Sequence, residues 1–185
     1  MVTSSTFGDP SRFRSFEDLR QALASLAPAP LRTGRLSIAV ARREGGLREI
    51  LPRTILSPES GISGDAWLTR VDRNPDAEIA VIQRDIAELL ANGQPLTLSG
   101  DNLFLDLDLS SANMPIGTRV RIGSALLAVT PKPHNGCHKF EKRFGPGALR
   151  LVSDPALRPR NLRGIYLRTL AAGEIAQGDP VQVLL

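Results

Sequence analysis

Apolar residues alternate with polar ones, or gather in short runs, along most of the chain after residue 34. In residues 102–109 a leucine occupies every second position, as expected of a half-buried β-strand. Residues 118–122 and 125–130 flank a Gly-Ser turn and predict a β-hairpin. The other strands that such runs predict cover residues 36–40, 47–51, 78–82, 165–170 and 181–184. The first two of these are joined through Gly45-Gly46 and predict a second hairpin.

Helical spacing is confined to three short stretches. Ser15 is a candidate N-cap for a helix that ends before the prolines of residues 27–30. Residues 84–91 predict a second helix, and residues 145–152 a third. Many short strands, glycine turns and few helices indicate a mainly β (α+β) fold, a β-barrel with a few short helices. We expect residues 1–33 to form an N-terminal helical appendage and residues 34–185 the barrel domain.

Composition narrows the class of protein. A chain of 185 residues with 42% hydrophobic residues suits one domain with an ordinary core. One cysteine excludes an internal disulfide framework and fits a reducing compartment. No secretory signal or membrane-length apolar run is visible, so we expect a cytoplasmic protein with no membrane partner.

The charge is unevenly distributed. The chain carries +4 overall, but residues 132–168 hold nine basic and two acidic residues, which gives this segment +7 and leaves −3 for the rest. Such a positive field attracts anionic small molecules and favours a thiolate. A solvated basic surface or a nucleic-acid patch would have the same charge. No nucleic-acid module accompanies it and aromatic residues are few, so nucleic acid is not the expected partner.

The only cysteine, Cys137, lies between the only two histidines, His134 and His138. Flanking prolines and a glycine indicate a rigid loop over residues 133–139. Imidazole and ammonium groups beside a thiol favour the reactive thiolate, so these three residues are the candidate catalytic groups. A lone cysteine is often an inert core residue instead. A zinc site made by the three would lack a fourth ligand and the usual spacing.

Several segments together resemble the MOSC domain, the module named for the C-terminal part of molybdenum-cofactor sulfurases. No single segment is specific, but their order and spacing match the family from about residue 36 onward. The matching segments are Gly61–Asp65, Gly100–Leu103, Pro115–Gly123, Val129–Pro131, His134–Phe140, Arg143–Gly145, Leu162–Tyr166 and Gly173–Asp179.

The resemblance implies a β-barrel of the pyruvate-kinase type built around one cysteine in a cleft. Family members carry sulfur as a persulfide, or bind molybdenum cofactor with the cysteine on the metal. That cysteine maps onto Cys137, which is therefore also the candidate molybdenum ligand. The family's Gly-acid-Asn-Leu motif maps its asparagine onto Asn102, with Asp101 where Glu is common. The chain departs from the family at Trp67, where His is frequent, and at Gly136, where Pro is frequent.

A site for this cofactor needs groups that bind a phosphate and polar pterin atoms, since molybdenum cofactor is strongly anionic. Arginine binds phosphate through two parallel hydrogen bonds, and lysine binds it as a point charge. The candidate cofactor-binding residues are Asn102, Lys139, Arg143, Arg163 and Arg168.

Three functions fit these features. In the leading hypothesis the protein binds molybdenum cofactor and carries sulfur on Cys137 for cofactor sulfuration, with a cysteine desulfurase or a molybdoenzyme as partner. Pyridoxal phosphate would then be found only on the separate desulfurase. The second hypothesis is a molybdenum-cofactor-dependent reductase of N-hydroxylated compounds, which needs an electron-transfer partner. The third is a non-catalytic module that binds an anion or RNA.

Overall fold

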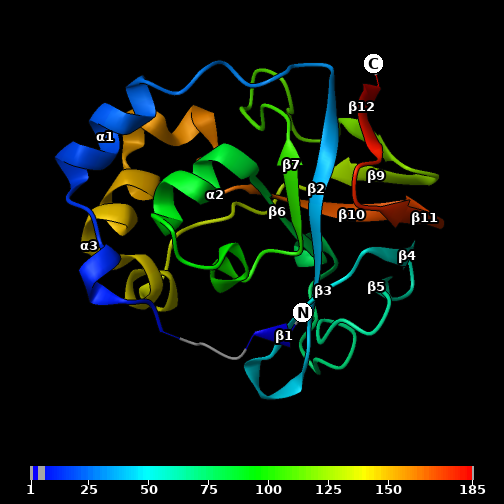
Figure 1. Cartoon of the computed structure of the whole chain (residues 1–185). Coiled ribbons are helices and arrows are strands. Elements are labelled where there is room, and N and C mark those ends of the chain that lie inside the picture. Colours follow the sequence, from blue (N-terminus) through cyan, green and yellow to red (C-terminus); the bar gives the residue numbers. More distant parts are fainter. Residues whose placement is uncertain (1, 4–6, 185) are drawn as a thin grey trace.

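A closed barrel of seven strands forms the centre of the computed structural model, which describes residues 2–3 and 7–184 (Figure 1). Around the barrel the strands follow the order β2-β12-β8-β9-β10-β6-β7, and β7 pairs back with β2. All these pairs are antiparallel except β6 with β7. The strands are β2 (Thr33–Arg42), β6 (Ile79–Gln83), β7 (Leu103–Asp106), β8 (Arg119–Ile122), β9 (Ala125–Val129), β10 (Ile165–Ala171) and β12 (Pro180–Leu184). The predicted mainly β barrel is confirmed.

The alternating leucine side chains of residues 102–109 fill the interior of the barrel. Leu103, Leu105, Leu107 and Leu109 are all fully buried in one hydrophobic cluster. Phe104 points to the other face of the same strand and is also fully buried, in a second cluster. The strand is therefore buried on both faces, where the alternation predicted one, because helices cover the outside of the barrel here.

Three helices lie together on one side of the barrel (Figure 1): α1 (Phe16–Ala24), α2 (Arg84–Ala91) and α3 (His138–Ser153). Ser15 caps α1 as predicted, because its hydroxyl accepts a hydrogen bond of 3.1 Å from the amide of Asp18. Leu19 and Leu23 bury one face of α1 in the second cluster. The separation of residues 1–33 as an appendage stays a prediction. Within the described residues, no helix is both long and apolar enough to cross a membrane.

Five strands lie outside the barrel ring. β3 (Arg48–Ile50) pairs with β2 as the predicted hairpin, and the backbone of β1 (Val2–Thr3) pairs with β3. A separate three-stranded sheet, in the order β11-β4-β5, was not predicted; it consists of β4 (Arg53–Ser57), β5 (Gly61–Ile62) and β11 (Gly173–Ala176). The short 3₁₀ helices are η1 (Pro10–Arg12), η2 (Glu44–Gly46), η3 (Pro75–Ala77), η4 (Leu96–Ser99) and η5 (Pro155–Arg160).

Helix α3 differs from the sequence prediction at its start. A loop was predicted over residues 133–139 and a helix over 145–152, but α3 already begins at His138 and Cys137 is its N-cap. The helix is kinked at Gly145, whose φ of +87° is non-helical. Pro146 follows this glycine and disfavours helical geometry at the residue before it. Phe140 and Phe144 bury the first half of α3, which is why helix forms there despite the kink.

Residues 7–14 pack closely against the kink in α3. The Gly8 amide donates to the Lys142 carbonyl at 3.1 Å, and a Cβ on Gly8 would collide with the Arg143 carbonyl. The Gln94 amide joins both segments, since its oxygen accepts from the Asp9 amide at 2.7 Å and its nitrogen donates to the Arg143 carbonyl at 3.4 Å. The N-terminal segment therefore holds the backbone of Arg143 in place.

We predict that Gly8→Ala separates residues 7–14 from α3, because the added methyl group overlaps the Arg143 carbonyl. The free energy of unfolding should fall by about 1–3 kcal/mol, the usual cost of overpacking. Amide hydrogen exchange at residues 8 and 9 should become faster. Ser11→Ala is the control, since the Ser11 side chain bonds only to Asp9 in the same segment. Unchanged exchange in Gly8→Ala would contradict this packing.

Candidate functional site

A buried carboxylate lies in the turn before β7. This turn follows η4 and passes through Gly100, whose φ is +82°, so that Asp101 points inward and is fully buried. Both carboxylate oxygens of Asp101 accept hydrogen bonds of 2.9 Å from Nη1 of Arg163. Burial is the largest single influence and raises the pKa of Asp101, but the charges of Arg163 and His134 and the hydrogen bonds from Arg163 and Ser99 together outweigh it, so the pKa is lowered. Asp101 and Arg163 thus form a buried ion pair.

His134 lies beside this ion pair. Its side chain is only 6% exposed, with Nδ1 3.8 Å from Oδ1 of Asp101. The imidazole packs against the ring of Tyr166, with the two ring centroids 4.3 Å apart. Burial, together with the positive charge of Arg163, lowers the pKa of His134 to about 3, although Asp101 acts in the opposite direction. The imidazole is therefore neutral at physiological pH.

Two further arginines flank the same turn. A Cβ built on Gly100 would lie 3.1 Å from Nη1 of Arg143 and 3.2 Å from Nη2 of Arg48. Burial is the largest influence on both guanidinium groups and lowers their pKa; for Arg48 the charge of Arg143 adds to it, and for Arg143 that of Arg163. Within the described chain neither arginine forms an ion pair, since Asp101 pairs with Arg163. We call Arg48, Arg143, Arg163 and His134 the basic cluster.

The basic cluster contains buried polar atoms without hydrogen-bond partners in the described chain. They are the Nε atoms of its three arginines and Nδ1 of His134. A buried polar group without a partner costs about 1–3 kcal/mol, and more when it is charged. Three unpaired guanidinium N–H groups around one turn can donate hydrogen bonds to an anion with several oxygen acceptors.

Cys137 lies exposed next to the basic cluster, as the N-cap residue of α3. A thiolate at a helix N-terminus is stabilised by the helix dipole. The charge of Cys137 also acts on two residues of the site: after burial and Arg163 it is the next influence on the pKa of Arg143, and it contributes at Tyr166 as well. The thiol is therefore both accessible to solvent and within electrostatic range of the buried guanidinium groups.

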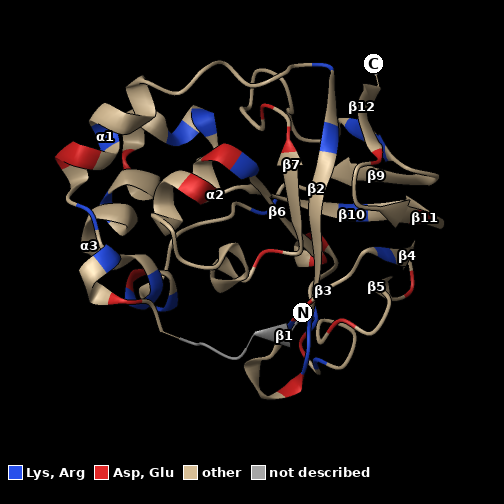
Figure 2. Cartoon of the chain, viewed as in Figure 1, with Lys and Arg blue, Asp and Glu red and all other residues tan. Residues whose placement is uncertain are grey.

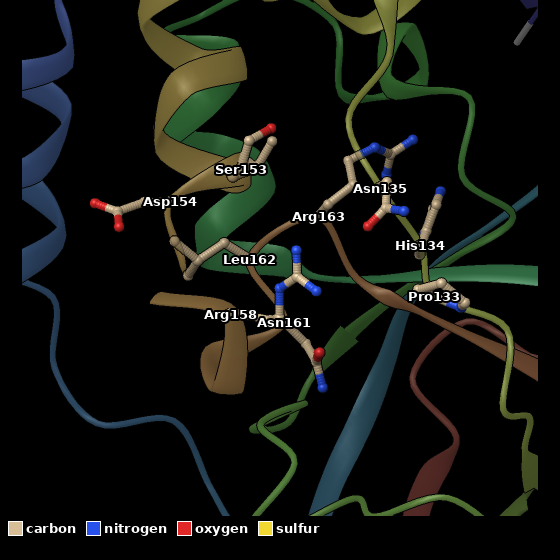
Figure 3. A pocket seen from close by; sticks show the side chains of 10 residues that line it. Pro133, His134, Asn135, Ser153, Asp154, Arg158, Asn161, Leu162 and Arg163 are labelled. Atoms are coloured by element: carbon tan, nitrogen blue, oxygen red, sulfur yellow. The ribbon is translucent and has the colours of Figure 1, made fainter. Parts of the chain in front are cut away.

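His134 and Arg163 also line a cavity of about 210 Å³ (Figure 3). Its remaining walls come from the loop before Cys137, the C-terminal end of α3 and the segment 158–162. Asp101, Cys137 and the two unpaired arginines do not line this cavity. Within the described residues, no three His, Cys, Asp or Glu side chains are grouped as a metal site.

Comparison with known proteins matches a model of the MOSC domain to residues 65–182. The chain belongs to the MOSC domain family. The YuaD protein from Bacillus subtilis is structurally similar, with a TM-score of 0.62, 15% sequence identity, and coverage of 84% of this chain and 98% of that chain. YiiM from Escherichia coli gives a TM-score of 0.55 at 20% identity over 82% of this chain and 70% of that chain. A search of curated proteins found no match.

Membership confirms the resemblance and the mainly β MOSC fold inferred from the sequence. The MOSC family is linked to molybdenum-cofactor binding, so an anion site beside the cysteine is in keeping with it. The structure places four of the predicted site residues together: Cys137, His134, Arg143 and Arg163.

Asn102 was predicted to bind cofactor, and its side chain has a structural role in this MOSC protein. It is fully buried; Oδ1 accepts from the Ala80 amide at 3.1 Å, and Nδ2 donates to the Val40 carbonyl at 3.1 Å and to Oδ2 of Asp65 at 2.9 Å. Both N–H groups and the carbonyl oxygen of the amide form hydrogen bonds inside the protein, and the cofactor-binding role of Asn102 stays a prediction. Asn102 joins β2 and β6 at the turn that carries Asp101.

Asp65, which accepts a hydrogen bond from Asn102, is itself held by further contacts. Its carboxylate pairs with the Arg42 guanidinium at 2.7 Å and accepts from the backbone amides of Arg42 and Trp67. Burial opposes ionisation, but the hydrogen bonds and charge of Arg42 prevail and lower the pKa of Asp65. Trp67, at the position where the family often has histidine, is 5% exposed and donates its indole N–H to the Asn74 carbonyl. The side chains of Asp65 and Trp67 therefore stabilise the local fold.

Three other predicted site residues point away from the basic cluster. The His138 side chain is 73% exposed and its Nδ1 lies 3.4 Å from Oε2 of Glu141. Lys139 is exposed on the same turn of α3, because Phe140 and Phe144 take the buried face. Arg168 is exposed on β10, where its charge acts on Glu78. The structure therefore does not bring these three side chains together with the basic cluster, and their roles stay predictions.

Arg48 was missed by the sequence analysis. It lies far from the basic segment of residues 132–168, and pairing of β3 with β2 brings it to Gly100. The hairpin itself was predicted, but the side of the hairpin that faces the site depends on tertiary packing. Figure 2 shows that Lys and Arg are interspersed with Asp and Glu over helices and barrel, so charge alone does not mark Arg48 as a member of the cluster.

The neutral, buried state of His134 predicts a specific pH dependence of stability. Below about pH 6.5 the unfolded chain binds a proton at this residue, whereas the folded protein binds it only near pH 3. The unfolded state then holds more protons, so stability falls as the pH decreases through this window, by about 1.4 kcal/mol per pH unit.

Urea unfolding between pH 6.5 and 4.5 measures this effect. His134→Gln should remove this component of the pH dependence, while His138→Gln, at an exposed position, should retain it. Identical slopes in wild type and His134→Gln would show that His134 is not held neutral by burial.

Proposed function

We propose that this protein binds molybdenum cofactor at the basic cluster and carries sulfur as a persulfide on Cys137. The observation that carries the proposal is the accessible thiol beside three buried guanidinium groups whose Nε atoms have no partner in the described chain. A protein gains nothing in stability from such groups, so a ligand is the simplest reason for them.

The residues fit an anionic pterin cofactor. Arg48 and Arg143 carry two positive charges and form no ion pair with a carboxylate of the described chain, which suits the charge of a phosphate monoester. These two arginines would hold the phosphate, and Cys137 lies where its sulfur can reach a ligand beside them. When bound, the cofactor supplies a metal ion that accepts sulfur as a ligand.

Sulfur transfer to Cys137 is a simple exchange. The Cys137 thiolate attacks the outer sulfur of a persulfide on a donor protein, a new S–S bond forms, and the donor leaves as its own thiolate. No external oxidant or reductant is needed. The nearby guanidinium groups stabilise negative charge on the persulfide while it waits for an acceptor. The donor would be a separate cysteine desulfurase that holds its own pyridoxal phosphate, and the acceptor the cofactor or a molybdoenzyme.

Mass spectrometry of the intact protein tests the proposal. After incubation with a cysteine desulfurase and cysteine, the wild type should gain the mass of one sulfur atom, which a thiol reductant removes. Cys137→Ser should gain none. Arg143→Gln should reduce the rate by about tenfold, since a charge-assisted contact contributes about 1.5–3 kcal/mol. Lys139→Gln is the matched control, because it removes an exposed charge from the same helix.

An unmodified Cys137 in the wild type would contradict the sulfur-carrier function. If Cys137→Ser also binds the cofactor as tightly as the wild type, a non-catalytic anion-binding module becomes the better description. Turnover of N-hydroxylated compounds by cofactor-loaded wild type, with loss in Cys137→Ser, would favour the reductase.

A further inference from the structure

The cavity behind the cysteine loop has the composition of a second anion site. It is lined on one side by Pro133, His134 and Asn135, and on the other by Ser153, Arg158 and Asn161, with Arg163 between them. Its volume of about 210 Å³ is below the roughly 300–1,000 Å³ of pockets for drug-sized ligands. It therefore suits a compact ligand.

The charge of the lining is positive. The guanidinium of Arg158 forms no ion pair and no side-chain hydrogen bond with any residue that the structure describes. Asp154 is the one acidic residue of the lining, and its Oδ1 accepts from the Ala156 amide at 2.9 Å. In Figure 3 its carboxylate points away from Arg163 and His134. No lining carboxylate is therefore directed at Arg158.

Two buried polar groups of the lining lack a partner. Nε of Arg163 and Nδ1 of His134 make no hydrogen bond within the described chain, and the His134 side chain is 94% buried, being 6% exposed. Arg163 donates from Nη1 to Asp101 and from Nη2 to the Ser99 carbonyl at 3.5 Å, which leaves Nε for a ligand. A group with several oxygen acceptors would satisfy these atoms together with Arg158.

We propose that this cavity binds a phosphate group, free or carried on a small molecule, between Arg158 and Arg163. Arg158 supplies the unpaired charge, and the neutral His134 and the Asn161 and Ser153 side chains supply polar contacts. Arg163 and His134 belong to both sites; Arg158 distinguishes the cavity from the cofactor site, whose Arg48 and Arg143 do not line it.

The location connects the cavity to the cysteine. Asn135 is two residues before Cys137, and the intervening Gly136 lies directly against α3: a Cβ there would be 2.6 Å from Cδ1 of Leu149 and 3.0 Å from Cγ2 of Val152. The loop has little freedom to shift independently of α3. A ligand on Asn135 and Ser153 would bridge the loop and the helix, and so hold Cys137 at the start of α3.

Titration with inorganic phosphate, followed by NMR of the arginine Nε–H groups, tests the site. The Arg158 and Arg163 signals should shift and saturate together. Arg158→Gln should weaken phosphate binding by about tenfold or more, as expected from loss of a charge-assisted contact of about 1.5–3 kcal/mol. Arg160→Gln, which removes an exposed charge from the same 3₁₀ helix, should leave it unchanged. In Arg48→Gln, which weakens the cofactor site, the Arg158 signal should still shift and saturate.

Equal weakening by Arg158→Gln and Arg160→Gln would overturn the proposal, since it would show attraction to surface charge alone. Loss of the shifts in Arg48→Gln would also overturn it, because phosphate would then occupy only the cofactor site. Repeating the titration with cofactor-loaded protein separates two sources of phosphate. Unchanged binding supports a phosphate site distinct from the cofactor site, whereas blocked binding would overturn the proposal, because the cavity would then hold the cofactor's own phosphate. Persulfide formation on Cys137 is measured separately, so either proposal can fail alone.

Discussion

The ion pair between Asp101 and Arg163 is the interaction on which the site depends. It joins the turn before β7 to the start of β10 inside the protein, with both carboxylate oxygens on one guanidinium nitrogen. Breaking a buried pair of this kind leaves an uncompensated charge and typically costs about 3–5 kcal/mol. Asp101 pairs with Arg163 and forms no ion pair with Arg48 or Arg143 within the described chain, although both lie at the adjacent Gly100 and its charge acts on both.

The elements around this pair hold each member of the site in place. Asn102 and Asp65 join the strands beneath the turn, and the N-terminal segment fixes the backbone of Arg143 through Gly8 and Gln94. His134 stays neutral because it is buried between Arg163 and Tyr166. The result is a rigid positive site with unpaired donors, next to an exposed thiol. Such a site stores unfavourable electrostatic energy that a bound anion can release.

Much of the fold could be predicted from the sequence, because local signals decide it. Leucines at every second position specify β7, and the Ser15 cap and the Asn92-Gly93 stop specify α1 and α2. The start of α3 could not be predicted, since Pro146 and Gly145 suggested that helix began later. The separate sheet of β4, β5 and β11 pairs segments far apart in the chain, which no local pattern reveals.

The site was predictable only where chemistry is concentrated along the chain. Cys137, His134 and Arg143 lie within one short segment and were found, whereas His138 and Lys139 belong to the same segment but project to solvent from α3. Arg48 reaches the site because β3 pairs with β2, and Asp101 becomes the partner of Arg163 only in the folded chain. Asn102 matched the family motif, yet its amide is fully used within the protein.

The central claim is that Arg163 is paired in the free protein, whereas Arg48 is held for a ligand. Urea unfolding of two variants at neutral pH tests it most directly. Arg163→Met should lower the free energy of unfolding by about 3 kcal/mol or more, since Asp101 loses its partner. Arg48→Met should leave it unchanged or raise it by about 1 kcal/mol, because an unpaired buried charge is removed. Equal destabilisation by both variants would contradict the account.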